Sequence, residues 1–442
     1  MKSRALTQTS CDLRCASPGP VRGGRPVVDL LSMLRWMFAV WVVIASAPWL
    51  ARAQETSPEV PIRILLSEGA REVRVSGLDV LARDALTQLE LTGPDARDVR
   101  IGLKDGRMLL GGRSIPSVRI WIESPSGVLQ HDGREYRSPL ELRLEENRLL
   151  LIAHMTLEHY LPGTLAGEMP ISWPLEALKA QAVVSRTYAW SLIQRSLRRP
   201  YDITPDVRDQ VFLGIGYDDP RALMAVKLTR GIVLSKDGEP IEAFFHSTCG
   251  GHTELASHVW PSASQQWPTV ACTHCRISPA ARWTLNLTPE ELAKALKEAG
   301  FRGEKVDRLE VLRRSPSGRA LTLEVVGGDQ RIEIEGNNFR RLIGYDRLKS
   351  TRFVHRIDEA EVHFEGEGYG HGVGMCQWGA RGLALQSTSA EEILSYYYSG
   401  TKRMQLVYMP PRPVSLGPEG PATGSALPSD DAAETVPASV MP

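Results

Sequence analysis

The sequence predicts a mixed α+β protein that is rich in strands and has a few isolated helices. Three observations predict this fold class. Residues 54–150 hold alternating, β-branched segments separated by Gly-rich turns, residues 174–198 carry apolar side chains at helical spacing, and strand patterns return at residues 308–335. Long β stretches with only a few helices between them fit neither an all-helical nor a doubly wound fold.

Length and charge narrow the class of protein. The chain has 442 residues, which is enough for two or three domains with cores of their own. Its 52 basic side chains equal its 52 acidic ones. A dedicated nucleic-acid binder needs a basic surplus to neutralise phosphates, so we expect no nucleic-acid partner.

An apolar run near the beginning predicts export. Residues 37–51 (MFAVWVVIASAPWLA) follow a basic lead and end in small residues at Ala51 and Ala53. This pattern is typical of a secretory signal, here residues 1–53 with cleavage after Ala53. The alternative is an uncleaved anchor, although a bilayer span needs about 20 residues. A start at Met33 or Met37 would give a more ordinary signal. We therefore expect a protein of the periplasm or cell envelope.

Helices and hairpins are expected from caps and turns. A helix should run from Pro174 to Arg198, since proline suits a first turn. Capping boxes at Thr288–Glu291 and Ser389–Glu392 should open two more, ending near Gly300 and Gly400. Hairpins are expected at residues 140–153 and 308–335. A Pro-rich tail at residues 409–442 reads as disordered. The β-rich part is residues 54–150, and residues 151–408 hold the motifs that carry chemistry.

Glu168 is the first chemical candidate. It lies in what reads as a small-residue loop, bracketed by Met169, Pro170 and Trp173. Apolar neighbours raise the pKa of a carboxyl group, as a general acid near neutral pH requires. The alternative is a surface glutamate that favours the positive end of the next helix.

The helix that follows carries a polar stripe. Gln181, Ser185 and Tyr188 recur at helical spacing, and Arg186 is one position round. An arginine with a tyrosine can hold a sugar or a carboxylate. The alternative is an ordinary solvated face.

Cysteine and histidine pairs predict a metal site in the loop of residues 246–275. Cys249 and His252 form one knuckle, and Cys272 and Cys275 form a second one. Four such ligands can surround a tetrahedral Zn²⁺ and would make the site structural. His246 and His274 are substitute ligands. The competing interpretation is a disulfide between Cys272 and Cys275, as exported cysteines often pair.

A Gly-rich segment, residues 366–378 (GEGYGHGVGMCQW), cannot be an ordinary strand, since alternate positions have no side chain to pack. It has neither a phosphate-loop nor a dinucleotide spacing. We expect a loop that lines a groove, with Tyr369 and His371 exposed on it. Cys376 is expected to be a small buried apolar residue. No motif predicts an organic cofactor.

Together these motifs resemble the SpoIID/LytB family, typified by stage II sporulation protein D. The resemblance covers roughly residues 60–408. It rests on three segments, EHYLPGTLAGEMPISWPLEALKAQAVVSRTYAW, FHSTCGGHTE and GYGHGVGMCQWGA, in that order. Two departures from the family's usual SQYGA, at Cys376 and Trp378, put only the loop contacts in doubt.

The resemblance implies a function and a set of site residues. Better-known members are lytic transglycosylases that act on peptidoglycan glycan strands already stripped of stem peptides by an amidase. Other members are described as amidase enhancers. The implied catalytic residues are Glu168, Arg186, Tyr188 and His371. The implied substrate-binding residues are Gln181, Ser185, Ser247, Tyr369, Gly370 and Gln377.

The expected reaction needs one carboxyl group, because the sugar supplies its own nucleophile and leaves a 1,6-anhydro product. Two further classes stay open. One is a non-catalytic glycan-binding enhancer of an N-acetylmuramoyl-L-alanine amidase. The other is a metal-dependent hydrolase, which requires an open position on zinc.

Overall fold

The structure is a computed structural model that describes residues 59–93, 95–216, 219–263 and 268–406. It confirms the mixed α+β class. The expected signal segment and the Pro-rich tail lie outside the described residues. Among the residues described, no helix has the length and apolar character to span a membrane.

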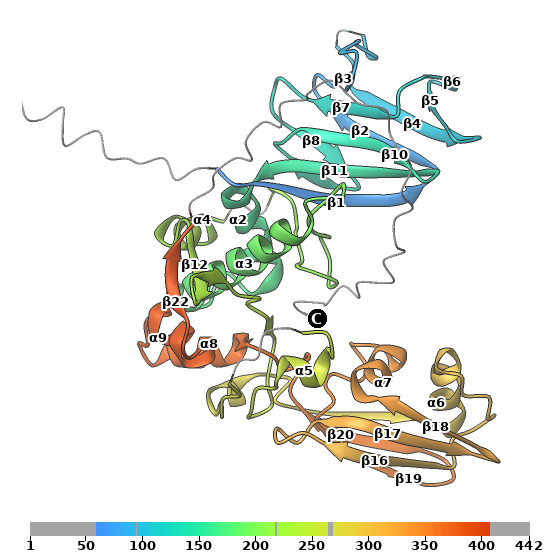
Figure 1. The fold of residues 1–442 in the computed structure, drawn as a ribbon, viewed down its shortest axis with the longest axis vertical. Helices are drawn as coiled ribbons and strands as arrows, with labels where there is room; N and C mark the ends of the chain where they lie inside the picture. Colours follow the sequence, from blue (N-terminus) through green and yellow to red (C-terminus); the bar gives the residue numbers. More distant parts are fainter. Residues whose placement is uncertain (1–58, 94, 217–218, 264–267, 407–442) are drawn as a thin grey trace, which may run out of the picture. The chain divides into compact units, whose positions relative to one another are not determined.

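Residues 61–156 form two antiparallel sheets that share one apolar core (Figure 1). The first sheet has the order β1-β11-β10-β7-β3, and the second has the order β6-β5-β4-β2-β8-β9. The strands are β1 (Pro61–Ala70), β2 (Glu72–Gly77), β3 (Leu81–Asp84), β4 (Asp98–Lys104), β5 (Arg107–Leu110), β6 (Arg113–Ser114), β7 (Arg119–Glu123), β8 (Leu129–His131), β9 (Arg134–Tyr136), β10 (Leu140–Glu145) and β11 (Arg148–Thr156). Alternate side chains such as Val73, Val75, Ile120 and Ile122 face the core.

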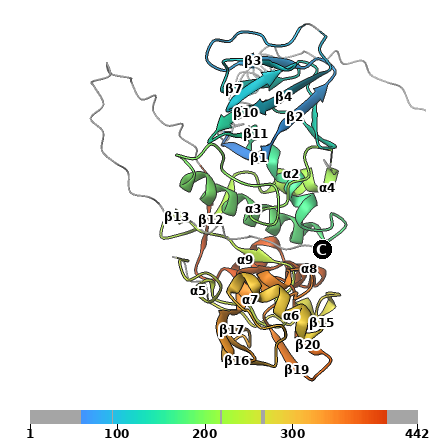
Figure 2. The same ribbon diagram turned by 90° about the vertical axis from the view of Figure 1, so that its right-hand side faces the viewer.

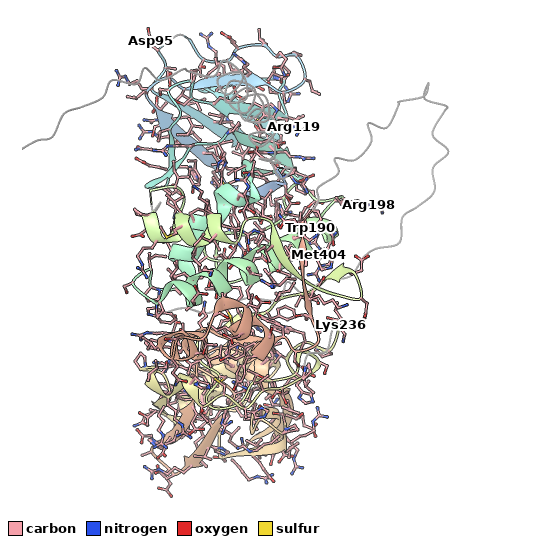
Figure 3. The ribbon with its side chains drawn as sticks, turned by 90° about the vertical axis from the view of Figure 1, so that its left-hand side faces the viewer. Asp95, Arg119, Trp190, Arg198, Lys236 and Met404 are labelled. Atoms are coloured by element: carbon pink, nitrogen blue, oxygen red, sulfur yellow. The ribbon has the colours of Figure 1, made fainter. Side chains whose placement is uncertain are left out.

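The other face of the first sheet carries a small apolar cluster of Leu65, Leu150 and Ile152 and, beside it, a polar group. Arg119 of β7, labelled in Figure 3, pairs with Glu141 of β10, and Glu141 also contacts His154 Nε2 at 2.8 Å. The hairpin expected at residues 140–153 is confirmed as β10 and β11. Glu146 and Asn147 form its turn with φ of 48° and 60°, the backbone conformation of a tight two-residue hairpin turn.

Three helices follow the sheets: α2 (Leu157–Glu168), α3 (Leu175–Arg195) and α4 (Pro220–Leu228). In Figures 1 and 2, α2 and α3 lie next to β1. Helix α3 confirms the expected helix. Helix α2 was not expected, because Pro162, Gly163 and Gly167 suggested a loop before Pro170.

The glycines of α2 let another segment lie directly on its backbone. A Cβ atom at Gly163 would come 2.8 Å from the ring of Phe212, and one at Gly167 would come 2.6 Å from the carbonyl oxygen of Val211. Residues 211–214 therefore pack against the helix at closer range than side chains would allow. Gly163 and Gly167 thus let residues 211–214 pack closely on the helix. Pro162 lies within the first half of the helix without ending it.

A second core surrounds the far side of α3. Its short elements are β12 (Ile232–Lys236), β13 (Glu239–Pro240), β14 (Phe245–His246), α5 (Ala256–Val259), the 3-10 turn η1 (His274–Ile277), β21 (Met375–Cys376), α8 (Gln377–Leu385), α9 (Ala390–Tyr397) and β22 (Lys402–Gln405). β14 pairs with β21 in parallel, and β22 pairs with β12. Met404 of β22 and Trp190 of α3, both labelled in Figure 3, pack against the first core.

Residues 282–367 form a module with its own apolar core. Its elements are β15 (Arg282–Leu287), α6 (Pro289–Ala295), the 3-10 turn η2 (Leu296–Ala299), β16 (Arg308–Arg314), β17 (Ala320–Gly327), β18 (Gln330–Glu335), α7 (Gly336–Ile343), β19 (Phe353–Ile357) and β20 (Val362–Glu367). The capping boxes at Thr288 and Ser389 and the expected hairpin turn between β17 and β18 are confirmed. Because β15 pairs with β20, the module leaves and rejoins the rest of the chain at one place.

The packing of α2 gives a stability prediction. Gly163→Ala should lower the free energy of unfolding by about 1–3 kcal/mol, because the new methyl group forces residues 212–214 away from the helix. Urea denaturation followed by circular dichroism measures the loss. Gly93→Ala is the matched control, since a Cβ atom there meets nothing within 4 Å. Equal stability of the two variants would contradict the close packing.

Candidate functional site

Glu168 is the last residue of α2, and its side chain is fully buried. The N–H group of Val211 donates a 2.6 Å hydrogen bond to Glu168 Oε1. The segment that packs on Gly167 therefore also covers the Glu168 carboxyl group. The alternative of a surface glutamate is wrong. Two cavities of about 740 and 670 Å³ lie elsewhere, and neither is lined by Glu168.

Buried amide groups join Glu168 to the polar stripe of α3. Gln377 Nε2, at the start of α8, donates to the carbonyl oxygen of Glu168 at 3.0 Å and approaches Gln181 Oε1 at 3.4 Å. Gln181 Nε2 in turn donates to Ser185 Oγ at 3.0 Å. None of these side chains is more than 1% exposed. The stripe is therefore not a solvated face, and three sequence motifs meet in one buried polar cluster.

Arg186 has a different role from the expected one. It is fully buried, and its Nε and Nη2 donate to the two carboxylate oxygens of Glu158 at 2.7 and 2.9 Å. The remaining donors reach the carbonyl oxygens of residues 182, 226 and 232 and the hydroxyl of Thr229. All of its donor groups are engaged by the protein, so Arg186 fastens α3 to α2 and to the start of β12. The contact of Arg186 with substrate stays a prediction, and in this structure its donors bind the protein itself.

Tyr188 lies in the apolar core. Its ring is 1% exposed and packs 6.0 Å from the ring of Phe244. Burial raises the pKa of Tyr188 well above its ordinary value, so the hydroxyl keeps its proton. Tyr188 thus supports the second core, and a direct contact with a sugar is not available in this conformation.

The Gly-rich segment lies against residues 244–250. Gly368, Gly370, Gly372 and Gly374 all have positive φ, between 73° and 106°, which other residues rarely adopt. Thr248 and Tyr369 exchange two backbone hydrogen bonds, of 2.9 and 2.7 Å. A Cβ atom at Gly370 would come 2.9 Å from Cβ of His246. The segment is irregular, as expected, and its glycines serve close contact between two backbones.

Tyr369 and His371 are buried, 3% and 6% exposed, although the sequence suggested that they were exposed in a groove. The Tyr369 hydroxyl donates to Asp346 Oδ1 at 2.6 Å. His371 Nδ1 accepts a 3.0 Å hydrogen bond from the N–H of Val373, and its ring lies 4.9 Å from that of Trp260. Ser247 is also buried beside this segment, and its carbonyl oxygen accepts from the N–H of Trp378. Tyr369 packs with Ala280 and Tyr345, and His371 packs with Phe244 and Trp260, so neither side chain lines an open groove in this structure.

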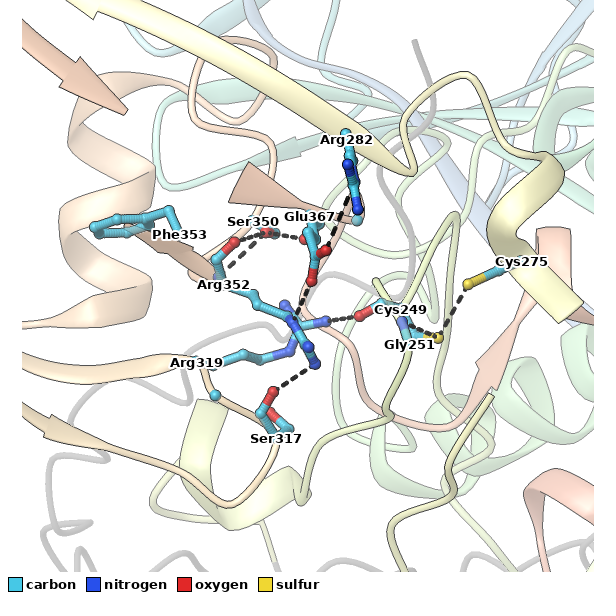
Figure 4. Close-up of polar contacts among 12 residues, drawn as sticks. Cys249, Gly251, Cys275, Arg282, Ser317, Arg319, Ser350, Arg352, Phe353 and Glu367 are labelled. Carbon is cyan, nitrogen blue, oxygen red and sulfur yellow. Dashed lines mark hydrogen bonds and ion pairs between the residues drawn. The ribbon is translucent and has the colours of Figure 1, made fainter. Parts of the chain in front are cut away.

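Four cysteines meet beneath the same segment. Cys249, Cys272, Cys275 and Cys376 are buried, and their sulfur atoms all lie within 4.8 Å of one another. Cys249 and Cys275, shown in Figure 4, approach to 3.5 Å, and none of the four forms a disulfide. A tetrahedral zinc with Zn–S bonds of about 2.3 Å spaces its sulfurs about 3.8 Å apart. The cluster could therefore bind a metal such as zinc.

The ligand set differs from the expected one. His252 lies outside the cluster, and its Nδ1 contacts the carbonyl oxygen of Thr253 at 2.9 Å. Cys376 takes the fourth position instead, brought there by the parallel pairing of β14 and β21. The N–H groups of Cys249 and Gly379 donate to Cys376 Sγ at 3.2 and 3.3 Å. The spacing of two knuckles could not reveal a ligand that lies a hundred residues further along the chain.

Arg319 is a site residue that the sequence did not suggest. It is 1% exposed, and its Nη2 donates to the carbonyl oxygen of Cys249 at 2.8 Å. Its guanidinium occupies the space that a side chain on Gly372 would need, 2.5 Å from an added Cβ atom. Figure 4 shows Arg319 reaching Cys249 from the 282–367 module. No sequence signal distinguishes this arginine from the exposed Arg313 and Arg314 nearby.

Comparisons with known proteins agree with the motifs. Residues 145–235 match the family model described as stage II sporulation protein (SpoIID), and residues 275–374 match a domain of unknown function, DUF8618. An uncharacterised protein of Brachyspira hyodysenteriae is 32% identical over 272 residues, which cover 61% of this chain and 72% of that protein. Stage II sporulation protein D of Bacillus subtilis is 28% identical, covering 60% and 79%. The amidase enhancer of Bacillus subtilis is 29% identical, covering 54% of this chain and 40% of the enhancer.

The contacts of Arg186 give a second prediction. Arg186→Met should lower the free energy of unfolding by about 3 kcal/mol, because it leaves the Glu158 carboxylate and several carbonyl groups without their donor. Chemical denaturation measures the change, and Arg195→Met, at a side chain that is 54% exposed on the same helix, should cost less than about 1 kcal/mol. An Arg186→Met protein that is as stable as the parent but inactive would contradict the structural role.

Proposed function

The chain belongs to the SpoIID family, and from this premise we propose that it is an exported lytic transglycosylase that cleaves the MurNAc–GlcNAc bond of peptidoglycan. The observation that carries the proposal is the full burial of the Glu168 carboxyl group beside a polar cluster. Val211 N–H donates to that carboxyl group, and Gln377, which also contacts Gln181, donates to the backbone carbonyl oxygen of Glu168. Residues from the 211–214 segment and from α8 thus meet at the end of α2 that carries the proposed acid.

In the proposed reaction Glu168 acts first as an acid. Its proton passes to the oxygen that bridges MurNAc and GlcNAc, and the C1–O bond breaks. The carboxylate then accepts the proton of the MurNAc C6 hydroxyl while that oxygen bonds to C1, which closes the 1,6-anhydro ring. One group thus gives a proton and receives one. The reaction therefore needs no second carboxylate and consumes no water.

The segment that covers Glu168 has to move for a glycan to enter. Val211 N–H occupies Oε1 of Glu168, and residues 211–214 lie directly on α2. Val211 faces Gly167 with its carbonyl oxygen and its Cγ1, and Phe212 is buried in the first core, so opening has to break both contacts while it leaves the second core in place. We propose that glycan binding displaces it, and that the closed form keeps Glu168 away from water.

A second candidate function is enhancement of an amidase without catalysis. Two observations favour it: the burial of Glu168, and the similarity to a protein named amidase enhancer. In this alternative the chain binds glycan strands and presents them to an N-acetylmuramoyl-L-alanine amidase. Under the leading proposal such an amidase acts earlier, removing stem peptides from the glycan. Both candidates require a protein outside the cytoplasmic membrane, which the apolar run at residues 37–51 supports.

We further propose that the four-cysteine cluster holds a structural zinc ion. Four thiolates fill a tetrahedral coordination shell, which leaves no position for a water or substrate and so argues against a metal-dependent hydrolase. The zinc would join Cys249, the 272–275 turn and Cys376, and thereby fix the Gly-rich segment.

The product of glycan cleavage tests the leading proposal. Digestion of denuded glycan strands should give fragments ending in 1,6-anhydroMurNAc, which mass spectrometry identifies. Glu168→Gln should lower the rate at least about 100-fold, because the amide cannot transfer the proton. Glu290→Gln, the same change at an exposed position of α6, is the control.

The alternatives give different outcomes in the same assay. Reducing-end products would identify a hydrolase. No product from the parent protein, together with full stimulation of an amidase by Glu168→Gln, would identify an enhancer. Denaturation of both glutamine variants establishes that they are folded.

Metal analysis tests the zinc proposal. The purified protein should contain one zinc per chain, and Cys376→Ser should lose most of it and melt at a lower temperature. His252→Ala should keep its zinc, because His252 lies outside the cluster. Loss of zinc from His252→Ala and its retention by Cys376→Ser would restore the ligand set that the sequence suggested.

A further inference from the structure

The 282–367 module carries a groove that the proposed reaction does not use. The groove has a volume of about 740 Å³ and lies over the ends of β15, β19 and β20 and the turn after β16. The residues that matter for the argument are Arg282, Trp283, Arg314, Arg352, Glu365 and Glu367. A mixture of basic and acidic groups around one hollow points to a ligand that also carries both charges.

One carboxylate in the groove is already neutralised. Arg352 Nε donates to Glu367 Oε2 at 2.9 Å, and Arg282 lies 4.0 Å from the other carboxylate oxygen. Figure 4 shows Glu367 between the two arginines. Arg352 is further held by the carbonyl oxygen of Ser317 at 2.7 Å. Arg282, whose side chain is 89% exposed, keeps most of its donors turned to solvent.

Arg314 is a cation without a carboxylate. Its Nη1 and Nη2 donate to the carbonyl oxygens of Gly318 and Phe353 at 2.9 and 3.0 Å. In the described part of the chain it makes no ion pair. The two carbonyl groups fix the guanidinium at the edge of the groove, so a ligand carboxylate would meet a donor that is already oriented.

The floor of the groove is rigid. The indole of Trp283 packs on Gly366, where any side chain would collide with it, and Trp283 Nε1 donates to the carbonyl oxygen of Gly368 at 2.8 Å. On the same sheet Val354 is 63% exposed, which offers a small apolar surface. A ligand that lies across this sheet orders few groups of the protein, so little entropy is lost on binding.

We propose that this groove binds a short peptide that carries free carboxylates and an ammonium group. One carboxylate pairs with Arg314, and the ammonium faces Glu365, whose side chain is 60% exposed. Taken with the proposed function, on which this identification rests, the peptide is a stem peptide of peptidoglycan. The module then holds peptide-bearing wall while the rest of the chain acts on glycan.

Charge favours a peptide over a polyanion. A phosphate polymer would bring further negative charge beside Glu365, which repels it at this range. A peptide with both signs of charge satisfies the arginines and Glu365 together, since Glu365 has His363 Nε2 at 3.1 Å from one oxygen and its other oxygen can accept from an ammonium group. Binding should therefore depend on the carboxylates of the ligand and weaken with salt.

Calorimetric titration of the full chain with the tripeptide L-Ala-γ-D-Glu-meso-diaminopimelate tests the proposal. Arg314→Gln should weaken binding at least about 10-fold, because a charge-assisted pair is lost. Arg313→Gln removes the same charge from the neighbouring exposed position, which does not line the groove, and should bind within about twofold of the parent.

Further binding measurements distinguish a peptide site from the alternatives. Equal binding by Arg314→Gln, or equal binding of the tripeptide with its carboxylates amidated, would overturn the proposal. Tighter Arg314-dependent binding of glycerol phosphate would assign the groove to a polyanion instead. Glu168→Gln should bind the tripeptide normally, so a failure of glycan cleavage and a failure of peptide binding are told apart.

Discussion

The site depends on the close approach of two backbones. Residues 368–376 lie against residues 244–250, and the approach is possible because alternate positions of the first segment are glycine. At Gly374 even one added carbon would run into the carbonyl oxygen of Phe244. The pairing of β14 with β21 follows from this contact, and it delivers Cys376 to three other cysteines and Gln377 to Glu168. A side chain at Gly368, Gly370 or Gly374 would push the two segments apart and so disturb both the polar cluster and the cysteine cluster.

The 282–367 module contributes to the same seam although it folds around its own core. Its first and last strands pair with each other, so the chain returns to the point that it left. From there Trp283 holds the carbonyl oxygen of Gly368, and Arg319 holds that of Cys249. Both contacts use backbone acceptors, which are present whatever side chains the seam carries. The module therefore stabilises the geometry of the Gly-rich segment as well as carrying a groove of its own.

Local signals predicted much of the fold, and distant contacts account for what they missed. The capping boxes at Thr288 and Ser389 and the hairpin turn at residues 146–147 are decided by neighbours in sequence, and all three are confirmed. Helix α2 was missed because its glycines are explained by their contact with residues 211–214, which no local pattern identifies. The sequence suggested His252 where the structure has Cys376 for the same reason. A parallel strand pair joins segments that are far apart in the chain. The burial of Tyr369 against Ala280 and Tyr345, and that of His371 against Phe244 and Trp260, likewise comes from residues far away in sequence.

Two glutamates on helix α2 have different surroundings, because only one of them pairs with Arg186. Glu158 and Glu168 are ten residues apart, which is about 15 Å along an α-helix, so one arginine cannot serve both. Arg186 donates two hydrogen bonds to Glu158, and its other donors bind mainly backbone carbonyl groups. Glu168 accepts hydrogen bonds from two neutral groups, a peptide N–H at its carboxyl and an amide at its carbonyl. In the proposed reaction Glu168 has to hold a proton and then release it, and an ion pair with Arg186 would hold its carboxyl group in the charged form. Because Arg186 pairs with Glu158 at the other end of α2, this arginine does not oppose the proposed proton transfer.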